Sequence, residues 1–195
     1  MMTKIPSLKV IGGIYKGRNI QMAPLEITRS SKAILRESLF NTLNTNIVGV
    51  NFVEFFAGSG SIGIEALSRG AKFALFFEQN RKSYAILKSN LTQICGNKAQ
   101  YQLILGDTFQ HYKTALKALQ SPCIGYLDPP FDVRENMQDI YTKCFKMLED
   151  LDANIFDLLI LEHHSTLIPS KNIGAFKHLK TKRFGKSTLS YFEST

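Results

Sequence analysis

Between residues 52 and 161, short apolar segments alternate with amphipathic segments, and this alternation is the strongest constraint on the fold. The apolar segments have the length and composition of buried strands, and the segments between them carry apolar residues at helical spacing. Strands joined through helices run parallel with right-handed crossovers, so the pattern predicts an α/β fold with a mostly parallel sheet. The expected strands are 52–56, 73–77, 101–105, 123–127 and 156–161, and the expected helices are 61–69, 80–94, 109–119 and 135–149.

The two ends of the chain do not follow this alternation. Residues 8–22 alternate apolar and basic side chains around glycines, which predicts one or two short strands, and serines at the start of 30–43 can cap a helix. Near the C-terminus, 175–194 predicts two strands, and this antiparallel hairpin is expected to close one edge of the sheet. We therefore expect a basic N-terminal extension, 1–45, followed by one catalytic domain, 46–195.

A glycine-rich loop follows the first strand of the alternation. Its sequence, Gly-Ser-Gly-Ser-Ile-Gly, lies where a strand ends and a helix begins, and its glycines let a ligand approach the backbone closely. Dinucleotide-binding proteins share this spelling, so the loop alone predicts a nucleoside cofactor without identifying it. The residues expected to contact the cofactor here are Phe56, Ala57, Gly58, Ser59, Gly60 and Gly63.

Three acidic residues at successive strand ends narrow the choice of cofactor. Glu54 lies just ahead of the glycine loop, where its charge disfavours a pyrophosphate and favours an ammonium group. Glu78 follows the second strand and can accept hydrogen bonds from two ribose hydroxyls, and Asp107 follows the third and can accept one from an adenine amino group. S-adenosylmethionine carries all three groups and is the expected cofactor.

The segment 128–131, Asp-Pro-Pro-Phe, ends the fourth strand. Each proline has a fixed φ, and Pro130 also restricts Pro129, so the backbone carbonyls at this corner point in set directions. The Asp128 carboxylate, a fixed carbonyl and the Phe131 ring suit a planar base that carries an exocyclic amine. We therefore expect these four residues to form the catalytic corner of a methyltransferase that acts on a base nitrogen.

The formal net charge of +8 is concentrated at the two ends of the 195-residue chain. Residues 1–50 hold seven Lys/Arg and two acids, and 171–195 hold six and one, whereas 51–170 hold eleven and thirteen. Two basic ends around a nearly neutral middle predict contact with nucleic acid. The expected phosphate contacts are Lys16, Arg18, Arg29 and Arg36 in the first part of the chain, and Lys180, Lys182, Arg183 and Lys186 in the last.

The composition argues against several other classes. The three cysteines form no CxxC pair and the four histidines have no metal-ligand spacing, so no metal site is expected. No apolar run reaches membrane-spanning length, and the first ten residues lack a signal-peptide core, which predicts a cytoplasmic protein without a membrane partner. The cluster Glu162-His163-His164 has no nucleophile near it in sequence and is expected to be inert.

Together, these motifs make the chain similar to the RsmD-type 16S rRNA guanine-N2 methyltransferases, over nearly its full length. The more specific similarities are Val-Ile-Gly-Gly and Lys-Gly-Arg within 10–18, and Arg-Glu-Ser-Leu-Phe-Asn at 36–41. The glycine loop, the segment 65–71 and the proline corner extend the resemblance. The chain departs from the family pattern at Glu54, where the family usually has Asp, and at 30–34, where it usually has Pro-Thr and Asp-Arg pairs.

The resemblance implies the class I S-adenosylmethionine-dependent methyltransferase fold, which is Rossmann-like with a seven-stranded sheet that ends in an antiparallel hairpin. It also implies methylation of the N2 amine of one guanine in 16S rRNA, by a monomer acting on an assembling or assembled small ribosomal subunit. Two alternatives stay open: an adenine-N6 methyltransferase acting on RNA or DNA, and a non-catalytic RNA-binding assembly protein. Only the glycine loop supports a nicotinamide-dependent oxidoreductase.

Overall fold

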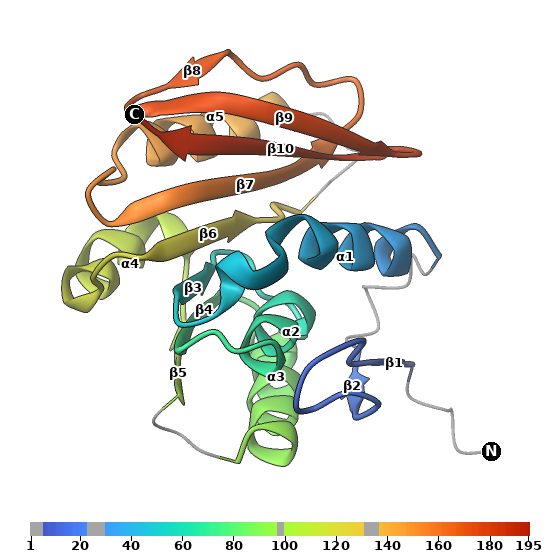
Figure 1. The fold of residues 1–195 in the computed structure, drawn as a ribbon. Helices are drawn as coiled ribbons and strands as arrows, with labels where there is room; N and C mark the ends of the chain where they lie inside the picture. Colours follow the sequence, from blue (N-terminus) through green and yellow to red (C-terminus); the bar gives the residue numbers. More distant parts are fainter. Residues whose placement is uncertain (1–5, 23–29, 97–99, 131–136) are drawn as a thin grey trace.

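A computed structural model describes residues 6–22, 30–96, 100–130 and 137–195, and a large central sheet organises them (Figure 1). Its strands are β3 (Asn51–Glu54), β4 (Phe73–Glu78), β5 (Tyr101–Leu105), β6 (Cys123–Leu127), β7 (Phe156–His164), β8 (Asn172–Ile173), β9 (Phe176–Phe184) and β10 (Ser187–Ser194). Their order in the sheet is β5-β4-β3-β6-β7-β10-β9-β8. The first five strands in this order are parallel and the last three pair antiparallel, which confirms the expected mixed sheet.

The sheet has one strand more than the seven expected, because β8 adds a two-residue edge strand. Ile173 pairs with Phe176, so only Gly174 and Ala175 connect β8 to β9. Gly174 has a φ of 57°, the left-handed conformation that a two-residue hairpin turn requires. This tight turn allows the two-residue strand β8, which the sequence analysis did not predict, to pair with β9.

Helices cover both faces of the sheet. They are α1 (Ser30–Leu43), α2 (Ser61–Ser68), α3 (Arg81–Ile94), α4 (Thr108–Ala115) and α5 (Met137–Glu149), with short 3-10 helices at Asn44–Ile47 and Leu116–Ala118. Helices α4 and α5 pack on one face, and α1, α2 and α3 pack on the other (Figure 1). Side chains cap the starts of α3 and α4: Asn80 accepts from the backbone N–H groups of Lys82 and Ser83, and Asp107 accepts from that of Phe109.

The continuous apolar runs of the parallel strands result from burial on both faces. In β4, Leu75 and Phe77 pack on the side of α4 and α5, whereas Ala74 and Phe76 pack on the side of α2 and α3. All four side chains are at most 1% exposed. The strand therefore needs apolar residues at successive positions rather than at every second one.

The N-terminal segment packs on the sheet domain through a small sheet and a helix. Strands β1 (Ser7–Lys9) and β2 (Asn19–Gln21) pair antiparallel, as expected for this region. Helix α1 buries Leu35, Leu39, Phe40 and Leu43 in a cluster with sheet residues from β3, β6 and β7. In the described part of the chain, no helix combines the length and apolar character needed to cross a membrane.

Candidate active site

A cavity of about 1180 Å³ lies at the carboxyl ends of the parallel strands, where ligands bind in open α/β sheets. Most residues expected at the cofactor loop and the catalytic corner line it. These are Glu54, Phe56, Ala57, Gly58, Ser59, Glu78, Asp107, Asp128, Pro129 and Pro130. Gly60 and Gly63 do not line the cavity, and Phe131 lies outside the described residues.

Four acids stand in a row along this edge of the sheet. Asp107 follows β5, Glu78 ends β4, Glu54 ends β3, and Asp128 follows β6, and these strands are neighbours in that order. The row therefore runs from the residue expected to bind adenine, past those expected to bind ribose and ammonium, to the one expected to bind the target amine. A single extended ligand lying across the strand ends can contact the first three.

The glycine loop is held in place by two of these acids. The backbone N–H of Gly58 donates to Glu78 Oε2 over 2.7 Å, and that of Gly63 donates to Glu54 Oε2 over 2.9 Å. Gly58 and Gly60 have φ values of 53° and 79°, which few other residues adopt. A Cβ on Gly63 would lie 2.2 Å from the ring of Phe76, so this glycine lets α2 pack closely against β4.

The Glu78 carboxyl is only partly exposed, and its surroundings shift its pKa. Burial raises this pKa above its usual value, while the backbone N–H groups of Asn80 and Gly58 oppose the shift by donating to the charged form. The two N–H groups lie 2.6 and 2.7 Å from its oxygens. Glu78 therefore takes up a proton at a higher pH than an ordinary glutamate does.

This shift predicts a pH dependence of cofactor binding. As pH falls through the raised pKa of Glu78, its carboxylate becomes a neutral acid, which weakens the contact we expect it to make with the ribose hydroxyls, so affinity for S-adenosylhomocysteine should fall up to about tenfold. Isothermal titration calorimetry from neutral to weakly acidic pH measures this. In Glu78→Gln, which cannot ionise, affinity should be lower at neutral pH and nearly independent of pH. An unchanged pH profile in that variant would assign the effect to another group.

The catalytic corner contains a second carboxylate that the sequence analysis missed. Leu127 pairs with Leu161 in the parallel register, so Asp128 and Glu162 follow at matching positions on neighbouring strands. Glu162 lines the same cavity and accepts a hydrogen bond from the Tyr126 hydroxyl over 2.6 Å. The sequence pattern did not place this residue at the cavity, and whether the cluster of Glu162 is inert stays untested. The sequence does contain a signal for this position, because Glu162 is an acid directly after an apolar strand.

Burial, and then the Glu162 charge, raise the pKa of Tyr126 well above its usual value, so the hydroxyl keeps its proton and donates. The other members of the cluster differ from each other. His163 is buried and its ring contacts Ser190 Oγ at 2.8 Å, within the sheet, whereas His164 lines the cavity. The cluster therefore contributes two residues to the cavity and one to the core.

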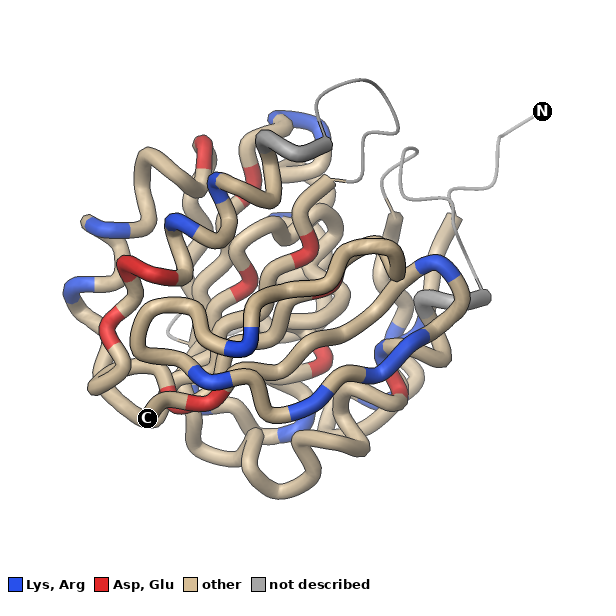
Figure 2. The backbone as a smooth tube through the Cα atoms, turned by 90° about the horizontal axis from the view of Figure 1, so that it is seen from above, with Lys and Arg blue, Asp and Glu red and all other residues tan. Residues whose placement is uncertain are grey.

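Most of the expected RNA-binding residues lie at the surface. Lys16, Arg18 and Arg183 are exposed, and Lys182 is partly exposed with its Nζ donating to Thr42 of α1 over 2.6 Å. In the view onto the β9–β10 hairpin, Figure 2 shows basic residues along β9. Arg18 also has a structural contact, because its Nη1 donates to the carbonyls of the last residues of α3. Arg29 lies outside the described residues.

Arg36 does not fit the expected contact with a surface phosphate. Its side chain is buried, with 4% of the residue exposed, and it lines the cavity beside the glycine loop. Helix α1 turns this position inward together with Leu35 and Leu39, which belong to the core. An RNA backbone at the surface of the protein cannot reach a guanidinium in this position.

Comparisons with known proteins agree with this geometry. The family described as "Conserved hypothetical protein 95" matches residues 8–193. "Ribosomal RNA small subunit methyltransferase D" of Buchnera aphidicola subsp. Acyrthosiphon pisum is 30% identical over 178 residues, which cover 89% of this chain and 88% of that protein. The Escherichia coli structure described as "Putative methyltransferase yhhF" has a TM-score of 0.74 and 25% identity, and the match covers 97% of this chain and 98% of that one. Since the family match spans nearly all of the sequence, the chain belongs to this family, the RsmD family.

Proposed function

We propose that this chain is an S-adenosylmethionine-dependent methyltransferase that modifies the exocyclic N2 amine of one guanine in 16S rRNA. The observation that carries the proposal is one cavity lined by both Asp128-Pro129-Pro130 and the acids Glu54 and Glu78. Transfer between a cofactor and a base requires that both be held in one space with the reacting atoms aligned. Membership of the RsmD family supports rRNA as the substrate class.

The residues of the cavity suit the groups of S-adenosylmethionine. Asp107 and Glu78 offer acceptors for the adenine amine and the ribose hydroxyls, and Glu54 offers a negative charge for the ammonium. The glycine loop gives close access to the backbone beside them. When bound, S-adenosylmethionine supplies a methyl group already activated by a sulfonium, so the protein needs to position the amine rather than activate the donor.

The catalytic corner is proposed to act on the nucleophile. The lone pair of guanine N2 is delocalised into the ring, which makes the amine a poor nucleophile. Hydrogen bonds from N2–H to the Asp128 carboxylate and the Pro129 carbonyl would hold the amine and favour a more tetrahedral nitrogen as the C–N bond forms. Asp128 can then accept a proton, because the methylated nitrogen becomes acidic before it loses one. Stacking of Phe131 on the base stays a prediction.

The position of Glu162 favours guanine over adenine. The Watson–Crick edge of guanine presents N–H donors at both N1 and N2, whereas adenine presents donors at N6 and an acceptor at N1. Asp128 and Glu162 follow adjacent parallel strands and line one cavity, although Glu162 is 1% exposed and accepts from Tyr126, so only a base inserted into the cavity would bring its two neighbouring donors to both carboxylates. A second carboxylate would face the N1 acceptor of adenine and repel it.

Radiolabelled methyl transfer to small ribosomal subunits from a strain lacking this gene tests the proposed function. Nuclease digestion should yield N2-methylguanosine from 16S rRNA. N6-methyladenosine would contradict the proposed base, and labelling of DNA would contradict the substrate. Binding of S-adenosylhomocysteine without transfer to free RNA, to assembling subunits or to assembled ones would favour a non-catalytic assembly protein.

Two further experiments test the proposed organisation of the protein. Gel filtration with light scattering checks that it is a monomer. Expression of residues 46–195 alone checks that they fold without the extension 1–45.

The basic hairpin is proposed to contact RNA phosphates, which predicts a change in salt dependence. The double variant Lys182→Ala/Arg183→Ala removes two charges of β9, so the slope of log affinity against log salt should become shallower by about 1–2. Fluorescence anisotropy with a fragment of 16S rRNA at several salt concentrations measures the slope. The control Lys88→Ala/Lys117→Ala removes two exposed charges from other parts of the surface and should leave it unchanged. Equal slopes in both variants would contradict a specific role for the hairpin.

A further inference from the structure

The buried guanidinium of Arg36 is not fully paired. Its Nη2 donates to the Lys9 carbonyl over 2.6 Å, but its Nε and Nη1 are buried without a hydrogen-bond partner among the described residues. Guanidinium groups carry five N–H donors, and a buried donor without an acceptor destabilises the fold. Such an unpaired group in a native protein requires an explanation, and a bound ligand is one that would supply the acceptor.

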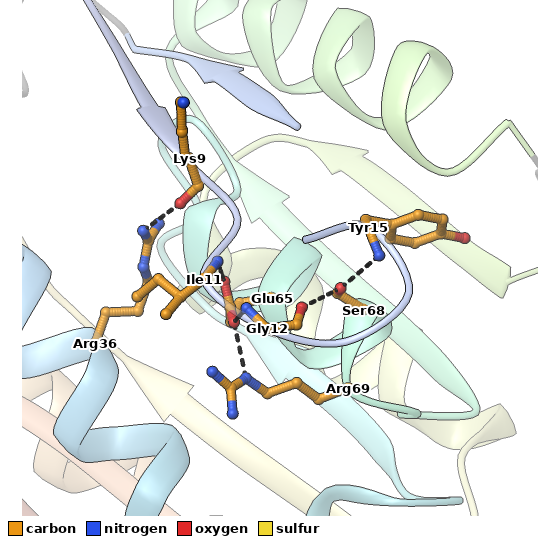
Figure 3. Close-up of polar contacts among 8 residues, drawn as sticks. All are labelled: Lys9, Ile11, Gly12, Tyr15, Arg36, Glu65, Ser68 and Arg69. Carbon is orange, nitrogen blue, oxygen red and sulfur yellow. Dashed lines mark hydrogen bonds and ion pairs between the residues drawn. The ribbon is translucent and has the colours of Figure 1, made fainter. Parts of the chain in front are cut away.

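The nearby Glu65 carboxylate does not provide that acceptor. It accepts from the backbone N–H groups of Ile11 and Gly12 over 2.7 and 2.8 Å, and from Arg69 Nε over 2.7 Å (Figure 3). These three bonds attach the N-terminal loop to α2 and pair Glu65 with Arg69. Glu65 exerts the largest charge effect on Arg36, but among the described residues Arg36 forms no ion pair and two of its nitrogens keep no hydrogen-bond acceptor.

The position of Arg36 along the row of acids indicates which group would bind it. Arg36 and Glu54 line the same cavity, and the adjacent Leu35 packs in one cluster with Ile62 of α2, next to the glycine loop. The other lysine and arginine residues that line the cavity, within the described chain, are Lys143 and Lys186. They belong to α5 and to the hairpin tip beside β7, which places them on the Asp128 side.

We infer that Arg36 binds the carboxylate of the amino-acid end of the cofactor, and this inference rests on the proposed methyl-donor function. The cofactor extends from Asp107 past Glu78 to Glu54, so its ammonium and carboxylate lie together at the end of the cavity that Arg36 lines. Glu54 supplies the negative charge for the ammonium, and Arg36 supplies the positive charge for the carboxylate. Hydrogen bonds between a guanidinium and a carboxylate are charge-assisted and are stronger than neutral ones. Arg36 therefore selects a ligand that keeps its carboxylate.

Two ligands that differ only in the carboxylate test this inference. Calorimetry with S-adenosylhomocysteine and with its decarboxylated analogue should give the wild-type protein a preference of about 10- to 100-fold for the first. In Arg36→Met, a variant of similar length without charge, this preference should disappear. The loss should come from weaker binding of S-adenosylhomocysteine, while affinity for the decarboxylated analogue changes little. Arg36→Lys keeps a positive charge and should retain part of the preference.

A neighbouring arginine provides the matched control. Arg69→Met removes a guanidinium that pairs with Glu65 and does not line this cavity, so it should lower stability without changing the preference between the two ligands. Equal weakening of both ligands in Arg36→Met would overturn the inference and give Arg36 a structural role, as would an unchanged preference. A wild-type protein that binds neither ligand would instead overturn the proposed function, and this inference with it.

Discussion

Asp128→Ala is expected to lower the rate of methyl transfer about 100-fold or more and to leave affinity for S-adenosylhomocysteine nearly unchanged. The effect is large because the carboxylate accepts hydrogen bonds from the reacting amine, and removing one preorganised acceptor destabilises the transition state. Cofactor affinity is retained because the acids expected to bind the cofactor, Glu54, Glu78 and Asp107, end or follow three other strands. Initial rates with labelled S-adenosylmethionine, together with calorimetry on the same preparation, separate the two quantities.

Asp128→Asn serves as the control for shape. It keeps an oxygen acceptor and the size of the side chain but loses the charge, so its rate should lie between those of wild type and Asp128→Ala. If Asp128→Ala weakens binding of S-adenosylhomocysteine as much as it slows transfer, the proline corner has a structural role. In that case, the proposed contact between Asp128 and the amine would be wrong.

Gly63→Ala is expected to lower the free energy of unfolding by about 1–3 kcal/mol and to weaken cofactor binding. The added Cβ would lie 2.2 Å from the Phe76 ring and 2.9 Å from Glu54 Oε2. Phe76 is fully buried and has no free space to move into, so α2 must shift away from β4. That shift also displaces the Gly63 N–H from Glu54 and with it the glycine loop. Urea denaturation and calorimetry with S-adenosylhomocysteine measure the two effects.

Gly12→Ala is the matched control for Gly63→Ala. Its added Cβ meets a side chain that can move, whereas the Cβ of Gly63→Ala meets a ring of the core. A Cβ on Gly12 would meet the terminal atoms of the Arg69 side chain at 2.6 Å, and this flexible group can move. The backbone N–H of Gly12 can still donate to Glu65, so this variant should lose less than about 1 kcal/mol. Equal stability of Gly63→Ala and wild type would show that α2 moves without cost, and would remove the stated reason for glycine at this position.

The sequence pattern predicted the parallel strands best. Both β5 and β6 have the bounds expected for them. Every residue of β6 is buried, so this strand is a continuous apolar run, whereas β5 is a partly exposed edge strand. By contrast, β7 extends to His164, beyond the apolar run that predicted its end at residue 161. The polar residues at the end of β7 pair with β10, where Ser187 is the partner of His164. No local pattern reports a pairing between residues so far apart in the chain.

Helix ends were predicted less well than helix positions. The segment expected as a helix at 109–119 is an α-helix only to Ala115, followed by a 3-10 turn over Leu116–Ala118. Such tightening is common where the last carbonyls of a helix lack partners further along the chain. The apolar spacing is nearly the same in both helix types over one turn, so the sequence cannot distinguish them there.

The chemistry at the strand ends was determined by the sequence itself. Glu54, Glu78, Asp107 and Asp128 each end or closely follow an apolar run, and parallel strands bring such positions to one edge whatever the other contacts are. The positions of Arg36 and Glu162 at the cavity were decided only by the tertiary structure. The rotation of α1 about its own axis and the pairing of β7 with β6 and β10 depend on contacts between distant segments. Residue type identifies a charge, but packing decides whether that charge meets solvent or a ligand.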